Sequence, residues 1–309
     1  MADAVKLSFV LPCYNEADNI DYIHRELVKV CGSLKEITPE LLFIDDGSAD
    51  GTFERIRKIT ETDDRVKGIA FSKNFGKTLA IYAGLRESRG DFVITMDSDG
   101  QHPPSLIPEL IEKQREGFEI VNTRREQNKG VGFLSRMRSR TFYRFINFLS
   151  DVKVEPLASD YRLMTRKAVD AFLTLEERDR YTNGLISWMG FRQTSIPFTA
   201  PRRHAGRTSF SGRMLLRLGL DGITSFSAKP LRISFTLGLI ILVFDFAYGI
   251  YAILNFFFGT TIPGWTSMMF TILFLGGVQL VSIGIIGEYI ARLFNESKRR
   301  PHYFIQDRC

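Results

Sequence analysis

The sequence predicts an α/β domain with a mainly parallel sheet, followed by a hairpin of two membrane-spanning helices. Short apolar runs alternate with helical patterns over residues 7–122, which is typical of α/β proteins. Residues 233–290 then contain only two charged side chains, Asp245 and Glu288, whereas the rest of the chain is strongly polar. The first part is therefore expected to fold in water and the second to lie in a bilayer.

Five short apolar runs are the predicted strands, and four periodic segments between them are the predicted helices. The strands cover residues 7–11, 41–44, 68–71, 92–96 and 119–122, and the helices cover residues 19–30, 52–60, 77–87 and 105–116. Parallel strands joined by crossover helices follow from this alternation. Because such sheets bind ligands beyond the carboxyl ends of their strands, functional residues are expected there.

Two apolar segments are long enough to cross a membrane. Residues 233–258 and 265–287 number 26 and 23, which as helices span about 39 and 35 Å against a hydrocarbon core of about 30 Å. Basic side chains flank the outer ends of this pair, at Lys229, Arg232, Arg292, Lys298, Arg299 and Arg300. The positive-inside rule therefore predicts a multi-pass plasma-membrane protein with both chain ends in the cytoplasm. Two buried helices of a soluble domain are the alternative.

The chain carries 41 Lys and Arg against 35 Asp and Glu, and the excess is concentrated in two segments. Residues 123–144 and 201–232 each hold seven basic side chains and one acidic side chain. In the second segment, apolar residues interleave with Arg213 and Arg217, as on an amphipathic helix that lies on anionic headgroups. A nucleic-acid partner is not expected, because no array of stacking aromatic residues accompanies the basic side chains.

These observations divide the chain into three predicted units. Residues 1–210 form a cytosolic domain, residues 211–230 an interfacial amphipathic helix, and residues 231–309 the hairpin with a basic cytosolic tail. We also expect a homo-oligomer.

Acidic residues follow the predicted strands at the positions where ligands are expected. Asp97 and Asp99 are alternate residues after the fourth strand, so their carboxylates can converge on one hard cation that also bridges phosphate oxygens. The Gly-Lys-Thr run at 76–78 is like the end of a P-loop, but that motif needs a glycine where Phe71 stands. No G-x-G-x-x-G follows the first strand. A P-loop ATPase and a dinucleotide-binding dehydrogenase are therefore disfavoured.

Four motifs resemble, in order and spacing, those of the family-2 nucleotide-sugar glycosyltransferases. They are P-C-Y-N-E at 12–16, I-D-D-G-S-A-D-G-T at 44–52, N-F-G-K-T-L-A-I-Y-A-G at 74–84 and D-F-V-I-T-M-D-S-D-G-Q-H-P-P at 91–104. Further motifs look like the polyprenyl-phosphate glycosyltransferases: A-S-D-Y-R-L-M at 158–164, R-R-H-A-G-R-T-S-F-S at 202–211 and F-S-A-K-P-L-R at 226–232. The chain is similar to the bactoprenol glucosyltransferases and, more distantly, to the dolichyl-phosphate mannose synthases. This resemblance covers nearly the whole chain and implies a glycosyltransferase-A type fold.

The resemblance also implies roles for residues at the strand ends. The positions that hold the nucleoside, with an aromatic face for uracil and an acid for its ring N–H, are Pro12, Tyr14, Glu16 and Asp46. The positions of the diphosphate–metal site are Asp97, Asp99 and Gln101, with Mg²⁺ or Mn²⁺ as the cofactor. All three supply the oxygen ligands that a hard cation requires. Lys77 is a further contact for the diphosphate, with a solvated helix residue as the alternative.

The acceptor side of the implied reaction involves Asp160 and several arginines. Asp160 corresponds to the carboxylate that the family assigns as catalytic base. A phosphomonoester has a second pKa near 6, so orientation of the acceptor and charge balance are alternative roles for Asp160. The candidates for holding the lipid phosphate are Arg124, Arg136, Arg138, Arg140, Arg202, Arg203 and Arg207.

The implied reaction is inverting transfer of glucose from UDP-glucose to undecaprenyl phosphate at the cytoplasmic membrane face. Mannose, N-acetylglucosamine or an aminoarabinose derivative would use the same motifs. A processive polysaccharide synthase shares the N-terminal motifs but normally has more membrane spans and a Q-x-x-R-W motif, which this sequence lacks. A scaffold built on a decayed transferase domain is the remaining alternative, and the intact acids of the metal site argue against it.

Asp245 lies near the middle of the first predicted span, where a carboxylate is costly and a partner is expected. In a hairpin that closes at residues 258 and 265, positions whose numbers sum to 523 share a depth in the membrane. Residue 278 is then opposite Asp245, with Gln279 within reach. The sequence therefore predicts a hydrogen bond between Asp245 and Gln279, within the hairpin or across an oligomer contact.

Overall fold

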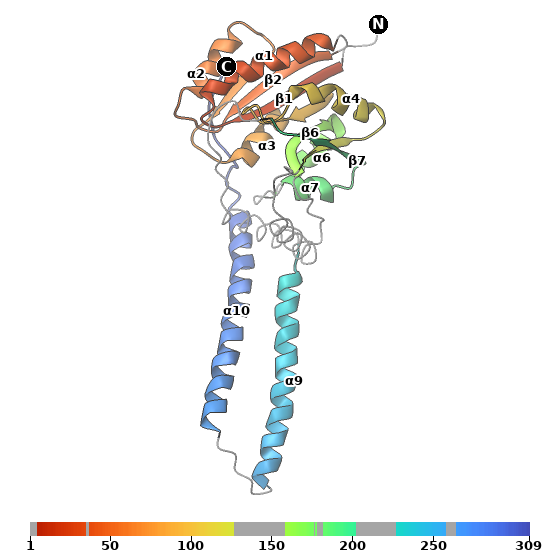
Figure 1. Ribbon diagram of the computed structural model, residues 1–309. Coiled ribbons are helices and arrows are strands. Elements are labelled where there is room, and N and C mark those ends of the chain that lie inside the picture. The colour runs from red at the N-terminus through yellow and green to blue at the C-terminus, as the bar shows by residue number, and fades with distance from the viewer. Residues whose placement is uncertain are drawn as a thin grey trace.

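The computed structural model of the protein describes residues 5–34, 37–126, 158–175, 177, 182–201, 227–257 and 264–309. Within these ranges the chain forms an α/β domain and two long helices that extend away from it (Figure 1). Most of the predicted interfacial helix at 211–230 lies outside the described residues.

A mainly parallel sheet is the centre of the α/β domain. Its four parallel strands β1 (Val5–Cys13), β2 (Ile37–Asp45), β3 (Val66–Phe71) and β4 (Phe92–Thr95) take the spatial order β4-β1-β2-β3. They correspond to the first four predicted strands, and β4 ends one residue before the predicted end at 96. Because they are parallel, their carboxyl ends lie at one edge of the sheet, where the predicted site residues follow.

Helices cover both faces of the sheet, because successive strand residues point to opposite sides. The helices α1 (Ala17–Ser33), α2 (Thr52–Thr60) and α4 (Ile107–Arg115) pack with Phe9 and Leu11 of β1, and the short 3-10 helix η1 (Pro104–Leu106) leads into α4. On the other face, α3 (Lys77–Glu87), α6 (Arg166–Leu173) and α7 (Thr182–Trp188) pack with Val10. The predicted α/β fold is confirmed.

The second half of the sheet contains antiparallel pairs that the sequence did not predict. β6 (Ala158–Thr165) lies antiparallel between β4 and β5 (Ile120–Arg125), and β7 (Gln193–Phe198) is parallel to β5 at the edge. In the β4–β6 pair, Thr95 is opposite Arg162. An antiparallel strand begins where its neighbour ends, so Asp160 near the start of β6 lies beside the carboxyl end of β4.

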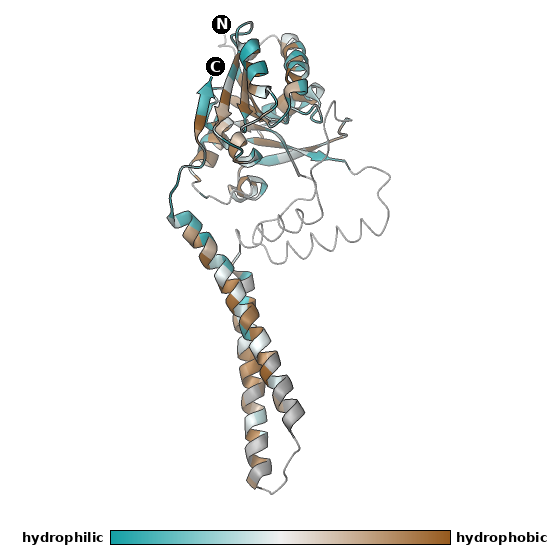
Figure 2. Ribbon diagram, turned by 90° about the vertical axis from the view of Figure 1, so that its left-hand side faces the viewer, coloured by the Kyte–Doolittle hydropathy of each residue, from teal (hydrophilic) through white to brown (hydrophobic). Residues whose placement is uncertain are grey.

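The two long helices correspond to the predicted membrane spans. α9 (Lys229–Phe257) and α10 (Trp265–Ser297) each contain a stretch long and apolar enough to cross a bilayer, and α10 continues beyond its predicted end at residue 287. Hydrophobic residues, coloured brown in Figure 2, run along both helices. Their side chains are exposed, with 74% of Phe235, 71% of Phe244 and 72% of Leu280 accessible. Core helices of soluble domains bury such side chains.

Two contacts fix how α9 and α10 face each other, and they differ from the predicted register. The Ser234 hydroxyl donates to Ser282 Oγ at 2.7 Å, and the Tyr289 hydroxyl donates to the Ser227 carbonyl at 2.6 Å. Each pair of numbers sums to 516 instead of 523. Position 271 therefore shares the depth of position 245, and Gln279 is about 12 Å farther along the helix. The predicted register is therefore wrong, whereas the predicted pairing of Asp245 with Gln279 falls on a side chain outside those described and stays a prediction.

The chain ends in the sheet and not in the hairpin. β8 (Ile305–Arg308) pairs antiparallel with β3 at the edge of the α/β domain. The predicted division grouped these residues with the hairpin as a basic tail. Periodicity did not identify β8, because a four-residue polar strand carries no apolar pattern.

Candidate active site

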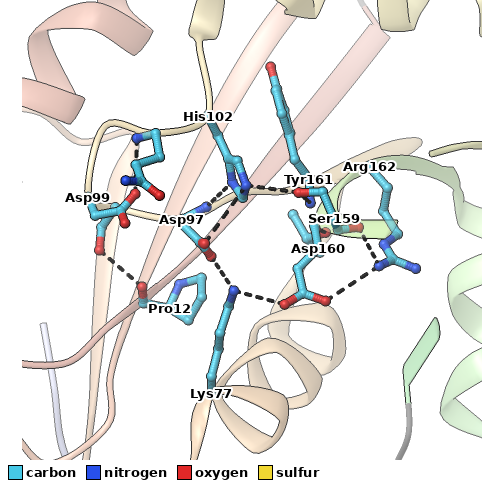
Figure 3. A network of polar contacts seen from close by, with 12 residues as sticks. Pro12, Lys77, Asp97, Asp99, His102, Ser159, Asp160, Tyr161 and Arg162 are labelled. Atoms are coloured by element: carbon cyan, nitrogen blue, oxygen red, sulfur yellow. Dashed lines mark hydrogen bonds and ion pairs between the residues drawn. The ribbon is translucent and has the colours of Figure 1, made fainter. Parts of the chain in front are cut away.

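The predicted acids come together at one edge of the sheet. Asp46 follows β2, Asp97 and Asp99 follow β4, and Asp160 is the third residue of β6. The Thr95 hydroxyl donates to the Asp160 carbonyl, which holds the start of β6 against the end of β4. Asp97 and Asp160 therefore approach each other from neighbouring antiparallel strands (Figure 3).

Lys77 lies between Asp97 and Asp160 (Figure 3). Its Nζ is 2.7 Å from Oδ1 of Asp97 and 2.8 Å from Oδ2 of Asp160. The Lys77 side chain is 46% exposed, and the two carboxylate side chains are 25% and 29% exposed. One ammonium group thus joins two carboxylates in a place that solvent and substrates can reach.

A tightly held turn positions Lys77 at the start of α3. The buried Asp46 carboxylate accepts hydrogen bonds from the backbone N–H groups of Phe75 at 2.7 Å and Gly76 at 2.8 Å. Gly76 has a φ of 101°, a conformation that glycine adopts without strain. Next to Asp46, Gly47 packs so closely on this segment that an added Cβ would collide with the Lys73 backbone. The sequence D-D-G at the end of β2 therefore fixes where α3 begins.

The three charged groups keep one another ionised. Burial raises the pKa of Asp160, but the Lys77 and Arg162 charges outweigh burial and lower the pKa to about 2. Burial also raises the pKa of Asp97, and Lys77 again reverses the effect, so that the pKa is lowered. For Lys77, burial lowers the pKa and the two carboxylates raise it above its ordinary value. All three side chains are therefore charged at neutral pH.

His102 connects the loop after β4, which carries Asp97, to the start of β6, which carries Asp160. Its buried ring stacks on Tyr161 with centroids 5.0 Å apart. Nδ1 accepts a hydrogen bond from the Asp97 backbone N–H at 2.8 Å, and Nε2 is 2.9 Å from the Ser159 hydroxyl oxygen. An accepting Nδ1 carries no proton, so the neutral imidazole has its proton on Nε2 and donates it to Ser159. Burial lowers the pKa of His102, which favours this neutral form.

Arg162 supports Asp160 from the side opposite Lys77. Its guanidinium donates to the Ser159 carbonyl at 2.8 Å and to the Asn183 side chain of α7, and it is 3.5 Å from Oδ1 of Asp160. Arg162 is only 2% exposed, and a buried guanidinium is stable only when its donors are paired. Asp160 is therefore held between two cations.

Sequence reasoning assigned no role to His102 or Arg162. For Arg162 a signal existed, because it shares a strand face with buried Met164, and a charge on a buried face needs a partner. For His102 no local signal existed, since its partner Ser159 is 57 residues away in sequence.

The predicted nucleoside residues lie around the ends of β1 and β2. The Pro12 carbonyl accepts a hydrogen bond from Ser98 at 3.1 Å, which ties the end of β1 to the acidic loop after β4. Tyr14 is 49% exposed, as a ring that stacks on a base must be. The Glu16 carboxylate accepts from the Asn19 side chain. Their nucleoside roles, and that of Asp46, stay predictions.

The predicted metal ligands share the loop after β4. Asp99 is 5% exposed and accepts from the Gln101 backbone N–H at 3.0 Å, while Gln101 Oε1 is 3.5 Å from an Arg125 nitrogen. In the part of the chain that the structure describes, no three His, Cys, Asp or Glu side chains form a metal cluster. The donor chemistry nevertheless fits a hard cation, because carboxylate and amide oxygens are its preferred ligands. The ammonium of Lys77 already places a positive charge beside Asp97.

One of the seven arginines predicted for the lipid phosphate falls within the described residues. Arg124 is exposed on β5. The others, Arg136, Arg138, Arg140, Arg202, Arg203 and Arg207, lie outside.

Fold, site and sequence comparison together define the class of protein. The profile of Glycosyl transferase family 2 matches residues 8–173, more than half of the chain. A second profile, the GtrB C-terminal hairpin, matches residues 229–293. The protein is therefore a glycosyltransferase, and it belongs to glycosyl transferase family 2.

Relatives match over nearly the whole length. The chain is 40% identical over 304 residues to an uncharacterized glycosyltransferase of Synechocystis, sll0501, covering 98% of this chain and 95% of that protein. It is 39% identical over 305 residues to the bactoprenol glucosyl transferase of Shigella phage SfX, covering 98% and 100%. A solved mannosyltransferase from Pyrobaculum calidifontis, in complex with GDP-Man and Mn²⁺, has a similar fold, with a TM-score of 0.52 at 16% identity over 72% of this chain and 64% of that one. The predicted family and glycosyltransferase-A type fold are confirmed.

Proposed function

We propose that the protein transfers glucose from UDP-glucose to undecaprenyl phosphate, or another polyprenyl phosphate, with inversion at the anomeric carbon. The observation that carries this proposal is the pair of carboxylates, Asp97 and Asp160, bridged by Lys77 in a domain joined to two membrane-length helices. Relatives named bactoprenol glucosyl transferase support the choice of sugar and acceptor. A lipid acceptor also accounts for the hairpin, since two membrane-length helices keep the domain at the bilayer that contains the acceptor.

The donor nucleoside is assigned to the loops after β1 and β2. The exposed ring of Tyr14 is available to stack on uracil, and Pro12, Glu16 and Asp46 border the same region. Asp46 already accepts two backbone hydrogen bonds from the turn before Lys77. It would therefore contact the nucleoside in addition to supporting this turn.

The diphosphate is assigned to Lys77 and the loop after β4. Asp97, Asp99 and Gln101 would hold Mg²⁺ or Mn²⁺, which supplies charge neutralisation for the departing UDP. The Mn²⁺ in the Pyrobaculum mannosyltransferase supports a divalent cation. Lys77, half exposed and adjacent to Asp97, is within reach of the same phosphate oxygens.

Asp160 is assigned to the acceptor. One bond forms between an acceptor phosphate oxygen and the anomeric carbon, the bond from that carbon to the diphosphate breaks, and the electron pair leaves with UDP. The acceptor phosphate has a second pKa near 6, so at neutral pH it is largely a dianion with no proton to remove. A carboxylate with a pKa of about 2 is also a weak base. We therefore assign Asp160 to orienting the acceptor and the cations around it, and not to proton abstraction.

The reaction is assigned to the cytoplasmic face of the plasma membrane. β1 and β8 belong to one sheet, so the chain before and after the hairpin lies on one side of the bilayer. The basic residues flanking the helices assign that side to the cytoplasm. We propose that the lipid phosphate is held near anionic headgroups by Arg124 and the six predicted arginines outside the described residues. We also propose that the protein is a homo-oligomer.

The proposal is tested with purified protein, a short polyprenyl phosphate and a panel of sugar nucleotides, with and without EDTA. The expected product is a lipid carrying one hexose, formed fastest from UDP-glucose and lost when EDTA removes the divalent cation. A faster rate with another donor would change the sugar and keep the reaction. A polymeric product would indicate a processive synthase, and no turnover with any donor would indicate a scaffold.

A further inference from the structure

Residues 302–309, here called the C-terminal strap, return from the second long helix to the α/β domain. β8 within the strap pairs with β3, from Arg308 opposite Ile69 to Ile305 opposite Phe71. Gly68 and Cys309 exchange two backbone hydrogen bonds of 2.8 and 2.9 Å, and the Ser72 N–H donates to the Phe304 carbonyl at 3.0 Å. The strap is thus an integral edge of the sheet. It lies beyond both matched family regions, which end at residues 173 and 293.

An aromatic series leads from the strap to the turn that carries Lys77. The Tyr303 ring stacks on Phe71, with centroids 4.8 Å apart and planes 19° from parallel. Phe71 meets Phe75 edge to face at 5.8 Å. Phe75 is two residues before Lys77, and its backbone N–H donates to Asp46. Tyr303 is therefore linked through Phe71 to the turn from which Lys77 reaches Asp97 and Asp160.

The strap also contacts the remainder of α3. The His302 ring meets the Tyr82 ring at 5.7 Å in the middle of the helix. At the end of α3, two Arg308 nitrogens are 3.0 and 2.9 Å from the Glu87 carboxylate oxygens. A bidentate pair of this kind fixes orientation as well as distance. The strap therefore contacts α3 in its middle and at its end.

We propose that the C-terminal strap is a positioning element of the active site, in which Tyr303 holds the Phe75–Lys77 turn so that the Lys77 ammonium stays between Asp97 and Asp160. The inference rests on the proposed function for the role of Lys77 in transfer. Because the strap continues directly from α10, the same contacts tie the site to the membrane helix. The residues after the hairpin thus serve catalysis as well as anchoring.

Kinetics of matched variants test the proposal. Tyr303→Ala removes the stacked ring and should lower kcat by roughly tenfold to a hundredfold, the scale of a misplaced catalytic group. Tyr303→Phe keeps the ring and should retain the wild-type rate. Arg57→Gln removes an exposed ion pair between α2 and Asp307 of the strap and should also leave the rate unchanged. Should Tyr303→Ala fail to fold, Tyr303→Leu keeps the apolar volume without the stacked ring and takes its place.

A double-mutant cycle shows whether Tyr303 acts through Lys77. If it does, Tyr303→Ala should cost little more once Lys77→Met has been introduced. Tyr303→Ala could instead lower kcat by the same factor in the wild-type and Lys77→Met backgrounds. That result would overturn the proposal, because a purely structural effect of Tyr303 would not depend on Lys77.

Hydrogen exchange supplies a readout that does not depend on turnover. Tyr303→Ala should speed exchange in the segment 72–79, which contains the two amides bonded to Asp46, and leave the segment 97–103 unchanged. Unchanged exchange at 72–79 would refute the strap's positioning role even for an active enzyme. If the wild-type protein shows no transfer from any donor, the proposed function fails, whereas the exchange measurement still decides whether the strap holds the turn.

Discussion

A lysine between two carboxylates balances part of the charge in the site before any substrate binds. Lys77 contacts Asp97 and Asp160, and Arg162 adds a second cation beside Asp160. Opposite charges at these distances favour the ionised form of each carboxylate. The residues are therefore suited to binding and orienting charged groups, which is what a reaction between a sugar diphosphate and a lipid phosphate requires.

The pH dependence follows from this electrostatic arrangement. Asp160, with a pKa of about 2, does not change its charge between pH 5 and 8. The acceptor phosphate does, because its second pKa is near 6, and protonation makes it a poorer nucleophile. We expect kcat/KM to fall as the pH is lowered through about 6. Replacing the acceptor by a polyprenyl phosphonate, whose second pKa is higher, should move this fall in kcat/KM to higher pH. If the fall stays at the same pH, the group that titrates belongs to the protein and not to the acceptor.

His102 offers a second residue-level prediction, because its two ring nitrogens have separate partners. His102→Asn keeps an acceptor near the Asp97 N–H but loses Ser159, and His102→Gln does the reverse. We expect each to reduce kcat in part and His102→Ala to reduce it most, with an unpaired buried amide costing about 1–3 kcal/mol of stability. Steady-state kinetics and thermal unfolding measure both effects. A fully active His102→Ala protein would show that the link between the two acidic segments is dispensable.

At the scale of elements, the junction of β2 and α3 determines where the site lysine lies. Asp46→Asn leaves one acceptor oxygen for two partly buried N–H groups, those of Phe75 and Gly76. The expected loss is about 1–3 kcal/mol of unfolding free energy, together with reduced transfer. Chemical denaturation in detergent measures the first effect, with the exposed change Asp64→Asn as a charge-matched control. Equal stability of the two variants would contradict the role given to Asp46.

Elements with local signals could be predicted from the sequence, and elements made by distant pairing could not. The strands up to residue 96 and the helices between them follow from apolar periodicity, and the acids after β2 and β4 follow from parallel strands. The placement of Asp160 beside Asp97 depends on β6 inserting antiparallel next to β4. For Lys77, the sequence did not distinguish a contact to the diphosphate from a solvated helix residue. Only the fold shows that α3 starts next to two carboxylates.

The hairpin register was missed for a related reason. Apolar periodicity reports which residues avoid water and says nothing about the offset between two helices. We expect the double variant Ser234→Cys with Ser282→Cys to form a disulfide on oxidation in membranes, because these hydroxyl oxygens are 2.7 Å apart. The matched pair of cysteines at positions 245 and 278, opposite each other in the predicted register, should not cross-link within one chain. Cross-linking is measured by gel mobility after proteolysis. The reverse pattern would support the predicted register, in which the numbers of positions at the same depth sum to 523.

At the scale of the whole molecule, the membrane helices and the active site are connected through the C-terminal strap. The chain leaves the sheet, makes the hairpin and returns to pair with β3 at the sheet edge (Figure 1). Transfer from a soluble donor to a lipid needs both a site at fixed orientation and an anchor beside the acceptor. The fold provides both with one polypeptide, and sequence motifs alone identify the two parts without showing that they touch.

The central claim is that Asp160 serves the transfer step and does not itself hold the donor. Single-turnover transfer and UDP-glucose binding, the latter by thermal stabilisation, should be measured side by side for the wild-type and Asp160→Asn proteins. We predict that Asp160→Asn loses transfer to polyprenyl phosphate by orders of magnitude while its affinity for UDP-glucose stays nearly unchanged. An Asp160→Asn protein that loses donor affinity, or that transfers glucose at the wild-type rate, would contradict this account.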